Sequence, residues 1–236
     1  DEVLRHYGGA IGVLADYWDN CYVDDTYYHN GQPTKVEGYC TDVFFSAATQ
    51  FIDKSVEQKK PFFVYLPTNV PHGPTICPPA DSTPYANDKT RKPQKYCGMI
   101  ANVDENVGKL RAHLKERGLA DNTIFIFTTD NGAAAGTCLF NAGMRGNKLS
   151  SYDGGHRVPF FMHWPVGGFD KEQRIETLTA HIDVFPTMLD LCGLETPEGV
   201  KMDGTSLRPL LEKGDHSDWP DRIIMTDSQK LELPRK

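Results

Sequence analysis

The sequence lacks several features that would place it in a specialised class of protein. Its longest apolar stretches are strand-sized pieces such as residues 61–66, far shorter than a membrane span. Its six cysteines contain no C-x-x-C pair, which argues against a zinc ribbon. It also has no N-x-S/T acceptor site, so one mark of a glycoprotein is missing. Positive charge is not in excess, because the formal net charge is −7, and a nucleic-acid partner therefore has no global electrostatic support.

The remaining composition is that of an ordinary globular domain. A chain of 236 residues is long enough for one α/β domain with a sizeable core and too short for two. Hydrophobic residues make up 39% and charged residues 24%, which argues against disorder. The negative balance leaves an anionic substrate possible, because a bound cation and a few basic groups can dominate locally. The six cysteines allow either disulfides or free thiols, so the redox compartment stays open.

Hydrophobic periodicity predicts alternating helices and strands. Helices are predicted at residues 41–58, capped by Thr41, at 94–117, ended by Gly118, and at 184–192, ended by Gly193. A buried strand is predicted at residues 61–66, and further strands at residues 123–128 and 158–163. This rhythm indicates a mostly parallel sheet covered by helices on both faces. Ligands bind such sheets at the carboxyl ends of the strands, where two long polar loops begin, at residues 67–93 and 130–157.

The first of these loops carries His72. Pro71 and Pro74 flank it closely and restrict the backbone, so the imidazole is held in one direction. A histidine can bind an anion when it is protonated, or it can donate a proton to a leaving oxygen. A loop histidine without a role is the alternative interpretation.

Asp130 and Asn131 follow the strand predicted at residues 123–128. Their side chains offer the hard oxygen donors that calcium or magnesium prefers, and Gly132 lets the chain turn away behind them. An ordinary strand-to-loop turn is the alternative, because Asp-Asn-Gly is also good turn chemistry. Calcium takes about six to eight oxygen ligands. Two side chains cannot supply them, so any further ligands must come from elsewhere.

The second loop also carries two basic residues, Arg145 and Lys148. The glycines around them permit a close approach of backbone to a ligand, and the two side chains bring positive charge to it. An exposed basic loop can equally be a solvated surface.

Together these segments resemble the later motifs of the sulfatase family, within the alkaline-phosphatase superfamily. The resemblance rests on His72 with its prolines and on residues 129–132, 145–148 and 153–159, and weaker agreement extends it over nearly the whole chain. It implies an alkaline-phosphatase-like α/β sandwich with a mostly parallel sheet flanked by helices. Residues 1–236 would then be a partial catalytic domain, truncated at both ends.

The resemblance also implies roles for single residues. Asp130 and Asn131 match family ligands of one calcium ion, and Asp130 matches the aspartate held to take a proton from the hydrated nucleophile. His72 and Lys148 match the histidine and lysine that bind the sulfate and assist departure of the alcohol oxygen. The expected partner is a sulfate-ester substrate, and no protein partner is indicated. A periplasmic or secreted location is suggested by the family alone.

One family motif is absent. The family nucleophile is a formylglycine made from Cys or Ser within C/S-x-P-x-R, and the nearest stretches, at Cys77 and Ser82, lack the arginine. We expect that motif to precede Asp1, and we expect the chain alone to be inactive. Two alternatives remain open: a phosphodiester or phosphonate hydrolase of the same superfamily, and a non-catalytic fragment or homologue.

Overall fold

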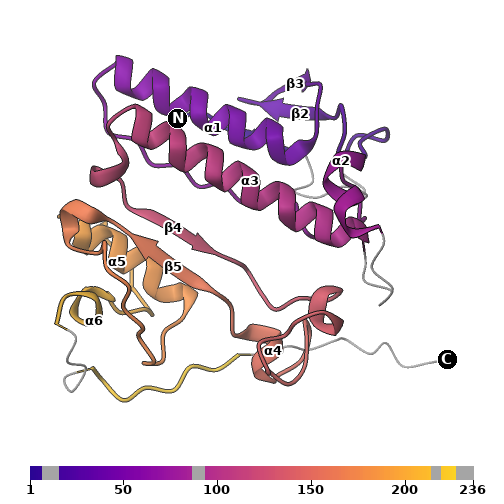
Figure 1. Cartoon of the computed structure of the whole chain (residues 1–236). Helices are drawn as coiled ribbons and strands as arrows, with labels where there is room; N and C mark the ends of the chain where they lie inside the picture. The colour runs from indigo at the N-terminus through magenta and orange to yellow at the C-terminus, as the bar shows by residue number, and fades with distance from the viewer. Residues whose placement is uncertain (7–15, 87–93, 214–218, 227–236) are drawn as a thin grey trace. The chain divides into compact units, whose positions relative to one another are not determined.

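The computed structural model of the chain describes residues 1–6, 16–86, 94–213 and 219–226. The chain divides into two compact units: unit 1 is Asp1–Ala120 with Ala133–Gly143, and unit 2 is Asp121–Gly132 with Met144–Lys236. Each unit contains helices and a small antiparallel sheet (Figure 1). Among the described residues, every helix is too short or too polar to span a bilayer.

Unit 1 begins with a three-stranded sheet in the order β1-β2-β3. Its strands are β1 (Leu4–Arg5), β2 (Thr26–His29) and β3 (Gln32–Lys35), and both pairs run antiparallel. The turn between β2 and β3 consists of Asn30 and Gly31, whose φ angles of 51° and 82° fit a two-residue primed turn. The sequence interpretation did not include this hairpin.

Two long helices, α1 (Cys40–Glu57) and α3 (Gln94–Glu116), pack against each other in unit 1 (Figure 1). They confirm the helices predicted at residues 41–58 and 94–117. Gly118 ends α3 as predicted, because its φ of 69° lets its own N–H bond back to the carbonyl of Lys115.

The predicted helix cap at Thr41 is wrong. The N-cap position belongs to Tyr39, whose carbonyl accepts the first helical hydrogen bond from Val43. The helix therefore starts one residue earlier than predicted, and Thr41 is buried inside its first turn.

Short helical segments complete unit 1. They are α2 (Pro79–Ser82), η1 (Thr83–Tyr85) and η3 (Gly136–Cys138). The first two lie within the loop predicted at residues 67–93 and pack against α3. Residues 87–93 of that loop lie outside the described part of the chain.

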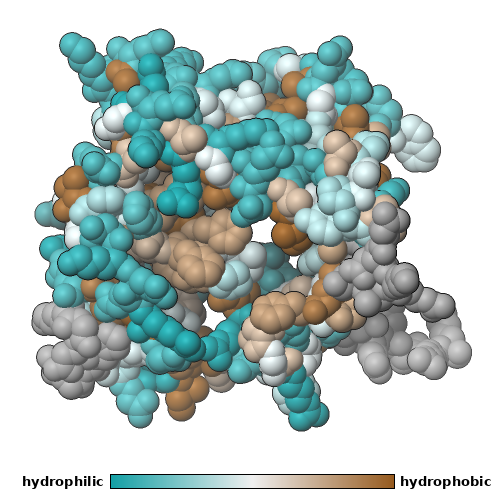
Figure 2. Space-filling view, viewed as in Figure 1, coloured by the Kyte–Doolittle hydropathy of each residue, from teal (hydrophilic) through white to brown (hydrophobic). Residues whose placement is uncertain are grey.

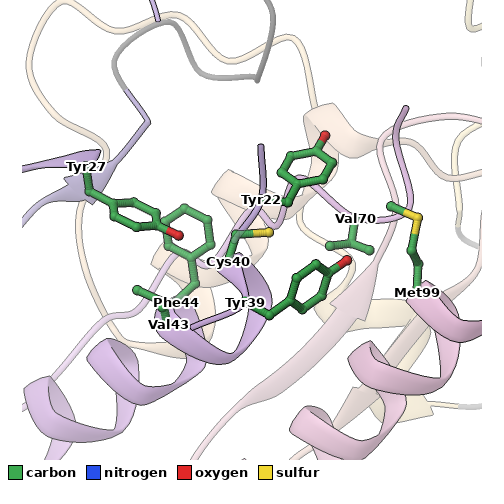
Figure 3. Close-up of a cluster of buried hydrophobic side chains, with 8 residues drawn as sticks. All are labelled: Tyr22, Tyr27, Tyr39, Cys40, Val43, Phe44, Val70 and Met99. Atoms are coloured by element: carbon green, nitrogen blue, oxygen red, sulfur yellow. The ribbon is translucent and has the colours of Figure 1, made fainter. Parts of the chain in front are cut away.

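An aromatic core fills unit 1 (Figure 3). Its buried members are Tyr22, Tyr27, Tyr39, Cys40, Val43, Phe44, Val70 and Met99. The rings of Tyr27 and Phe44 meet edge to face with centroids 5.5 Å apart, a favourable geometry for aromatic rings. Val70 belongs to this core, so the loop that follows residues 61–66 is attached to it by an apolar side chain.

Residues 61–66 do not form the buried strand that the sequence predicted. No described segment pairs with them, and a strand requires a hydrogen-bonded neighbour. Their side chains alternate in exposure, with Phe63 77% and Tyr65 79% exposed. The other side of the segment is half-buried, and this alternation is expected for an extended chain with a period of two.

Unit 2 contains a two-stranded sheet of β4 (Phe125–Thr128) and β5 (Phe160–His163). These confirm the strands predicted at residues 123–128 and 158–163. They pair antiparallel, with Phe125 opposite His163, so the expected parallel pairing is not found between the described strands. The connection between them contains only short helical turns, including α4 (Asp153–His156), and no crossover helix of the length that a parallel pair needs.

The rest of unit 2 contains a buried aspartate. Its elements are η2 (Ala120–Asn122), η4 (Pro165–Gly167), η5 (His181–Asp183), α5 (Val184–Leu191) and α6 (Arg208–Lys213). Asp183 is fully buried at the start of α5 and accepts hydrogen bonds from the backbone N–H groups of Ala180 and Thr205 and from the Arg222 guanidinium. The helix predicted at residues 184–192 is confirmed, and Gly193 follows it with φ 64°.

Hydrophilic residues cover much of the face seen in Figure 2, with smaller apolar patches between them. All six cysteines are free thiols, so no disulfide contributes to either unit.

Candidate active site

His72 lies on an exposed turn of unit 1. Its backbone N–H donates to the carbonyl of Asn69 over 3.0 Å, which closes the turn. Its ring Nδ1 donates to the carbonyl of Gly73 over 2.8 Å. The other ring nitrogen, Nε2, bonds to no described residue and is available to a ligand.

The turn is tied to the core below it by Tyr22. The Tyr22 hydroxyl donates to the carbonyls of His72 and Gly73, over 3.4 and 3.3 Å. Burial is the main cause that raises the pKa of Tyr22 to about 12, and the nearby groups of Cys40, Asp25 and Asp16 add to it. The hydroxyl therefore keeps its proton at neutral pH and remains a donor to the turn.

A buried chain of side chains, not predicted from the sequence, lies beneath the same turn. Asn69 Nδ2 donates to His6 Nδ1 over 3.0 Å, and His6 Nε2 lies 3.0 Å from Asp25 Oδ2. His6 is 2% exposed and Asp25 is fully buried. Asn69 and His6 are 63 residues apart in the sequence, and His6 and Asp25 are 19 residues apart, so no local pattern could have indicated these pairings.

Asp130 and Asn131 follow the end of β4 in unit 2, as predicted. Asp130 is exposed, and its Oδ1 accepts the backbone N–H of Asn131 over 2.9 Å. The side-chain amide of Asn131 donates to the other carboxylate oxygen, which leaves the Asn131 amide oxygen pointing to no described donor. The strand end itself is held by His181, whose Nε2 donates to the carbonyl of Thr129 over 2.8 Å.

Gly132 joins this strand end to the second polar loop. Its N–H donates to the carbonyl of Gly155 over 3.0 Å. A Cβ at Gly132 would lie 1.8 Å from the carbonyl oxygen of Gly154, so only glycine allows the two backbones to come this close. Gly155 in turn packs on the Asn147 carbonyl, where a Cβ would lie at 2.8 Å.

The second polar loop holds its two basic residues differently. Arg145 lies over the ring of Tyr152, with its guanidinium carbon 3.8 Å from the ring centre, and its carbonyl accepts the N–H of Gly154. Lys148 is half-buried, and its ammonium pairs with no described residue. The contact of Gly132 with Gly155, and of Gly155 with Asn147, therefore brings the Asp130–Asn131 pair and the segment of Lys148 together. His72 belongs to the other unit.

The donor set at Asp130 and Asn131 fits a hard cation in part. Carboxylate and amide oxygens are the atoms that calcium prefers, and both Asp130 oxygens already accept one hydrogen bond each from Asn131. No described basic side chain pairs with Asp130. Within the described residues there is no group of three or more His, Cys, Asp or Glu side chains that could hold a metal ion. The pair can therefore provide part of a calcium shell but not all of it.

Comparison with known proteins decides the family. The protein-family model described as Sulfatase matches residues 4–194. The chain belongs to the sulfatase family. It is 32% identical over 197 residues to the uncharacterized sulfatase YdeN of Escherichia coli, covering 81% of this chain, and 31% identical over 188 residues to human N-acetylgalactosamine-6-sulfatase, covering 78%.

Solved structures show the fold of this sulfatase-family chain. The crystal structure of Ps i-CgsB in complex with a neocarrahexaose has a TM-score of 0.73 and 35% identity, covering 78% of this chain and 41% of that one. A putative sulfatase, yidJ from Bacteroides fragilis, has a TM-score of 0.69 at 24% identity, covering 82% and 46%. The alkaline-phosphatase-like fold expected from the sequence is confirmed. The chain spans about a third of the length of the curated relatives, 34% for both YdeN and the human enzyme.

Proposed function

We propose that this chain supplies part of an active site that hydrolyses sulfate esters. The observation that carries the proposal is the glycine contact of unit 2, which joins an Asp–Asn pair to a lysine loop in a member of the sulfatase family. A sulfate ester is anionic, and its hydrolysis places further negative charge on the departing oxygen. Positive groups aimed at the sulfate and a proton donor at that oxygen would lower the barrier.

Within this scheme His72 and Lys148 act on the substrate. The Lys148 ammonium pairs with a sulfate oxygen and neutralises its charge. His72, when protonated, donates from Nε2 to the bridging oxygen, because its Nδ1 is already bonded to Gly73. As the nucleophile forms its bond to sulfur, the bond from sulfur to the bridging oxygen breaks and the alcohol leaves with this proton.

Asp130 and Asn131 would hold one calcium ion through their side-chain oxygens. The ion would supply positive charge at the sulfate and favour the deprotonated form of the nucleophile. Asp130 would also accept the proton that the nucleophile loses.

The nucleophile in this proposal is a hydrated formylglycine. Its C/S-x-P-x-R motif does not occur in these 236 residues, so the group must come from outside them. The chain by itself is then inactive, and it binds calcium weakly because the remaining ligands are missing.

A sulfated carbohydrate is the substrate class that we propose. Two relatives near 30% identity or above support it, since one is named N-acetylgalactosamine-6-sulfatase and the other is a structure in complex with a neocarrahexaose. A relative named steryl-sulfatase, 30% identical over 214 residues, supplies the competing class.

The test is an assay of the full-length protein on sulfated oligosaccharides, a steroid sulfate, and 4-nitrophenyl sulfate and phosphate. We expect sulfate release from the oligosaccharides that is lost on chelation and restored by calcium. Lys148→Ala and His72→Ala should each lower kcat/KM by about 100-fold or more, since each removes a charge-stabilising or proton-donating group.

Lys171→Ala is the matched control, because Lys171 is an exposed lysine of the same unit, and its activity should equal that of the wild type. Hydrolysis of the phosphate but of no sulfate would contradict the proposal in favour of a phosphohydrolase. Turnover of sulfate esters by the 236-residue chain alone, free of contaminating enzyme, would contradict the external nucleophile.

A further inference from the structure

Two routes of hydrogen bonds connect the buried carboxylate of Asp25 to the peptide of His72. In the first, Asp25 bonds to His6, His6 bonds to the Asn69 side chain, and the Asn69 carbonyl accepts the N–H of His72. In the second, Asp25 Oδ2 accepts the N–H of Tyr22 over 2.9 Å, and the Tyr22 hydroxyl reaches the carbonyl of His72. Both routes lie wholly in unit 1.

Both ring nitrogens of His6 and both carboxylate oxygens of Asp25 are hydrogen-bonded. An amide nitrogen can only donate, so His6 Nδ1 accepts from Asn69, and His6 Nε2 carries the proton that it donates to Asp25. Both ring nitrogens of His6 are thus in use. Asp25 Oδ1 accepts the N–H of Cys21 over 2.7 Å, which occupies the other carboxylate oxygen.

Packing alone does not account for these polar side chains. The His6 ring stacks on Tyr27 with centroids 4.5 Å apart and meets Phe44 edge to face at 5.6 Å, contacts that a phenylalanine would also make. Burying a carboxylate and an imidazole costs free energy that an apolar core would avoid. What the polar groups add is a set of directed bonds, some to the backbone of Cys21 and Tyr22 and others that lead to the exposed turn of His72.

We propose that Asp25 and His6 are positioning residues that hold the turn of His72, and with it Nε2, in the orientation needed to protonate the leaving oxygen. The His72 ring is itself bonded to the turn through Gly73, so a displaced turn displaces Nε2. This inference rests on the proposed role of His72. The side chain that connects His6 to the turn of His72 is that of Asn69. It is only half-buried, and its replacement leaves the His6–Asp25 pair intact.

The test compares two substrates in the full-length protein: an alkyl sulfate, whose leaving oxygen needs a proton, and 4-nitrophenyl sulfate, whose leaving oxygen needs little help. Asn69→Ala and His6→Phe should lower kcat/KM for the alkyl sulfate on the order of 10- to 100-fold, with a much smaller loss for the aryl sulfate. His6→Gln should recover most of this loss, because a glutamine amide can accept from Asn69 and donate to Asp25.

His113→Phe is the matched control. His113 also pairs with an aspartate in unit 1, Asp53, at 2.9 Å, and its loss should not change the ratio of the two rates.

A second readout does not depend on activity. With 15N-labelled histidine, NMR of the wild type should show Nδ1 of His72 as a protonated nitrogen hydrogen-bonded to Gly73, and Asn69→Ala should average the signals of the two ring nitrogens. Equal losses on both substrates, or an unchanged His72 signal in Asn69→Ala, would overturn the positioning role. If the wild type hydrolyses neither sulfate, the proposed function fails, and the NMR comparison alone then decides whether His6 and Asp25 hold the turn.

Discussion

The turn of His72 and the loops of Asp130 and Lys148 are held in place by different kinds of contact. The turn of His72 depends on buried side chains: a core valine, a tyrosine hydroxyl and the Asp25–His6–Asn69 chain. The loops of unit 2 depend on backbone packed against backbone at Gly132 and Gly155.

This difference has consequences for how each region responds to substitution. A side-chain network can lose one bond and keep the others, so its effects should be graded and open to rescue by a similar side chain. A backbone contact at glycine has no room for any Cβ, so its effects should be all-or-none.

The largest effect should come from Gly132→Ala. Its Cβ would lie 1.8 Å from a backbone oxygen, which cannot rotate away as a side chain could. We expect a loss of more than about 3 kcal/mol in the free energy of unfolding of unit 2 and loss of activity in the full-length protein. Urea unfolding followed by tryptophan fluorescence measures the first, because two of the three tryptophans, Trp164 and Trp219, belong to unit 2.

Gly108→Ala is the control for that substitution. Gly108 lies within α3, and a Cβ there would meet nothing within 4 Å, so alanine should stabilise unit 1 by about 0.5–1 kcal/mol. A Gly132→Ala protein with wild-type unfolding and activity would show that the backbone contact does not hold the loops.

The next largest effect concerns Asp183, the side-chain anchor of unit 2. Burial by itself raises its pKa, but the hydrogen bonds from Arg222, Thr205 and Ala180 outweigh burial, and the pKa lies below the ordinary 3.8. A lowered folded-state pKa gives stability that is present above the unfolded value and is lost as the pH falls through the folded value. Unit 2 should therefore lose stability as the pH falls below about 4.

Asp183→Asn should remove that acid-dependent loss and cost about 3 kcal/mol at neutral pH, because the Arg222 guanidinium keeps no charged partner there. Thermal unfolding between pH 3 and pH 7 checks both points. Asp190→Asn is the control, since Asp190 pairs with Arg208 at a more exposed position and should change stability less. An Asp183→Asn protein that keeps the acid transition of the wild type would assign that transition to other carboxylates.

The elements predicted well from the sequence are those whose pattern is local. The long helices show the 3.6-residue period, and Gly118 and Gly193 mark helix ends through their positive φ. The Asp130–Asn131 pair was placed correctly at a strand end because the strand itself, at β4, has a clear apolar run. The β2–β3 hairpin had a local signal too, the Asn30-Gly31 pair, which the interpretation overlooked.

The elements that could not be predicted depend on distant partners. Residues 61–66 have the apolar run of a strand, but a strand forms only where another segment pairs with it. The same holds for the direction of β4 and β5, which the order of elements did not reveal. His6 and Asp25 are 19 residues apart and share no periodic pattern, so only the folded core shows that they meet.

The smallest effect, and the one that most sharpens the comparison, should come from Tyr22→Phe. The hydroxyl bonds at 3.3 and 3.4 Å are long, and the route through His6 and Asn69 remains, so we expect a loss of about 1 kcal/mol in stability and a small loss of activity on alkyl sulfates.

Because the folded-state pKa of Tyr22, about 12, exceeds the ordinary 10.0, the wild type gains stability from Tyr22 below pH 10 and loses it as the pH rises toward 12. Tyr22→Phe should flatten part of that alkaline loss in a pH series of unfolding midpoints. If Tyr22→Phe lost as much activity as Asn69→Ala, the turn of His72 would respond in an all-or-none way, as is expected of the glycine contact. The graded response that we expect of a side-chain network would then be wrong.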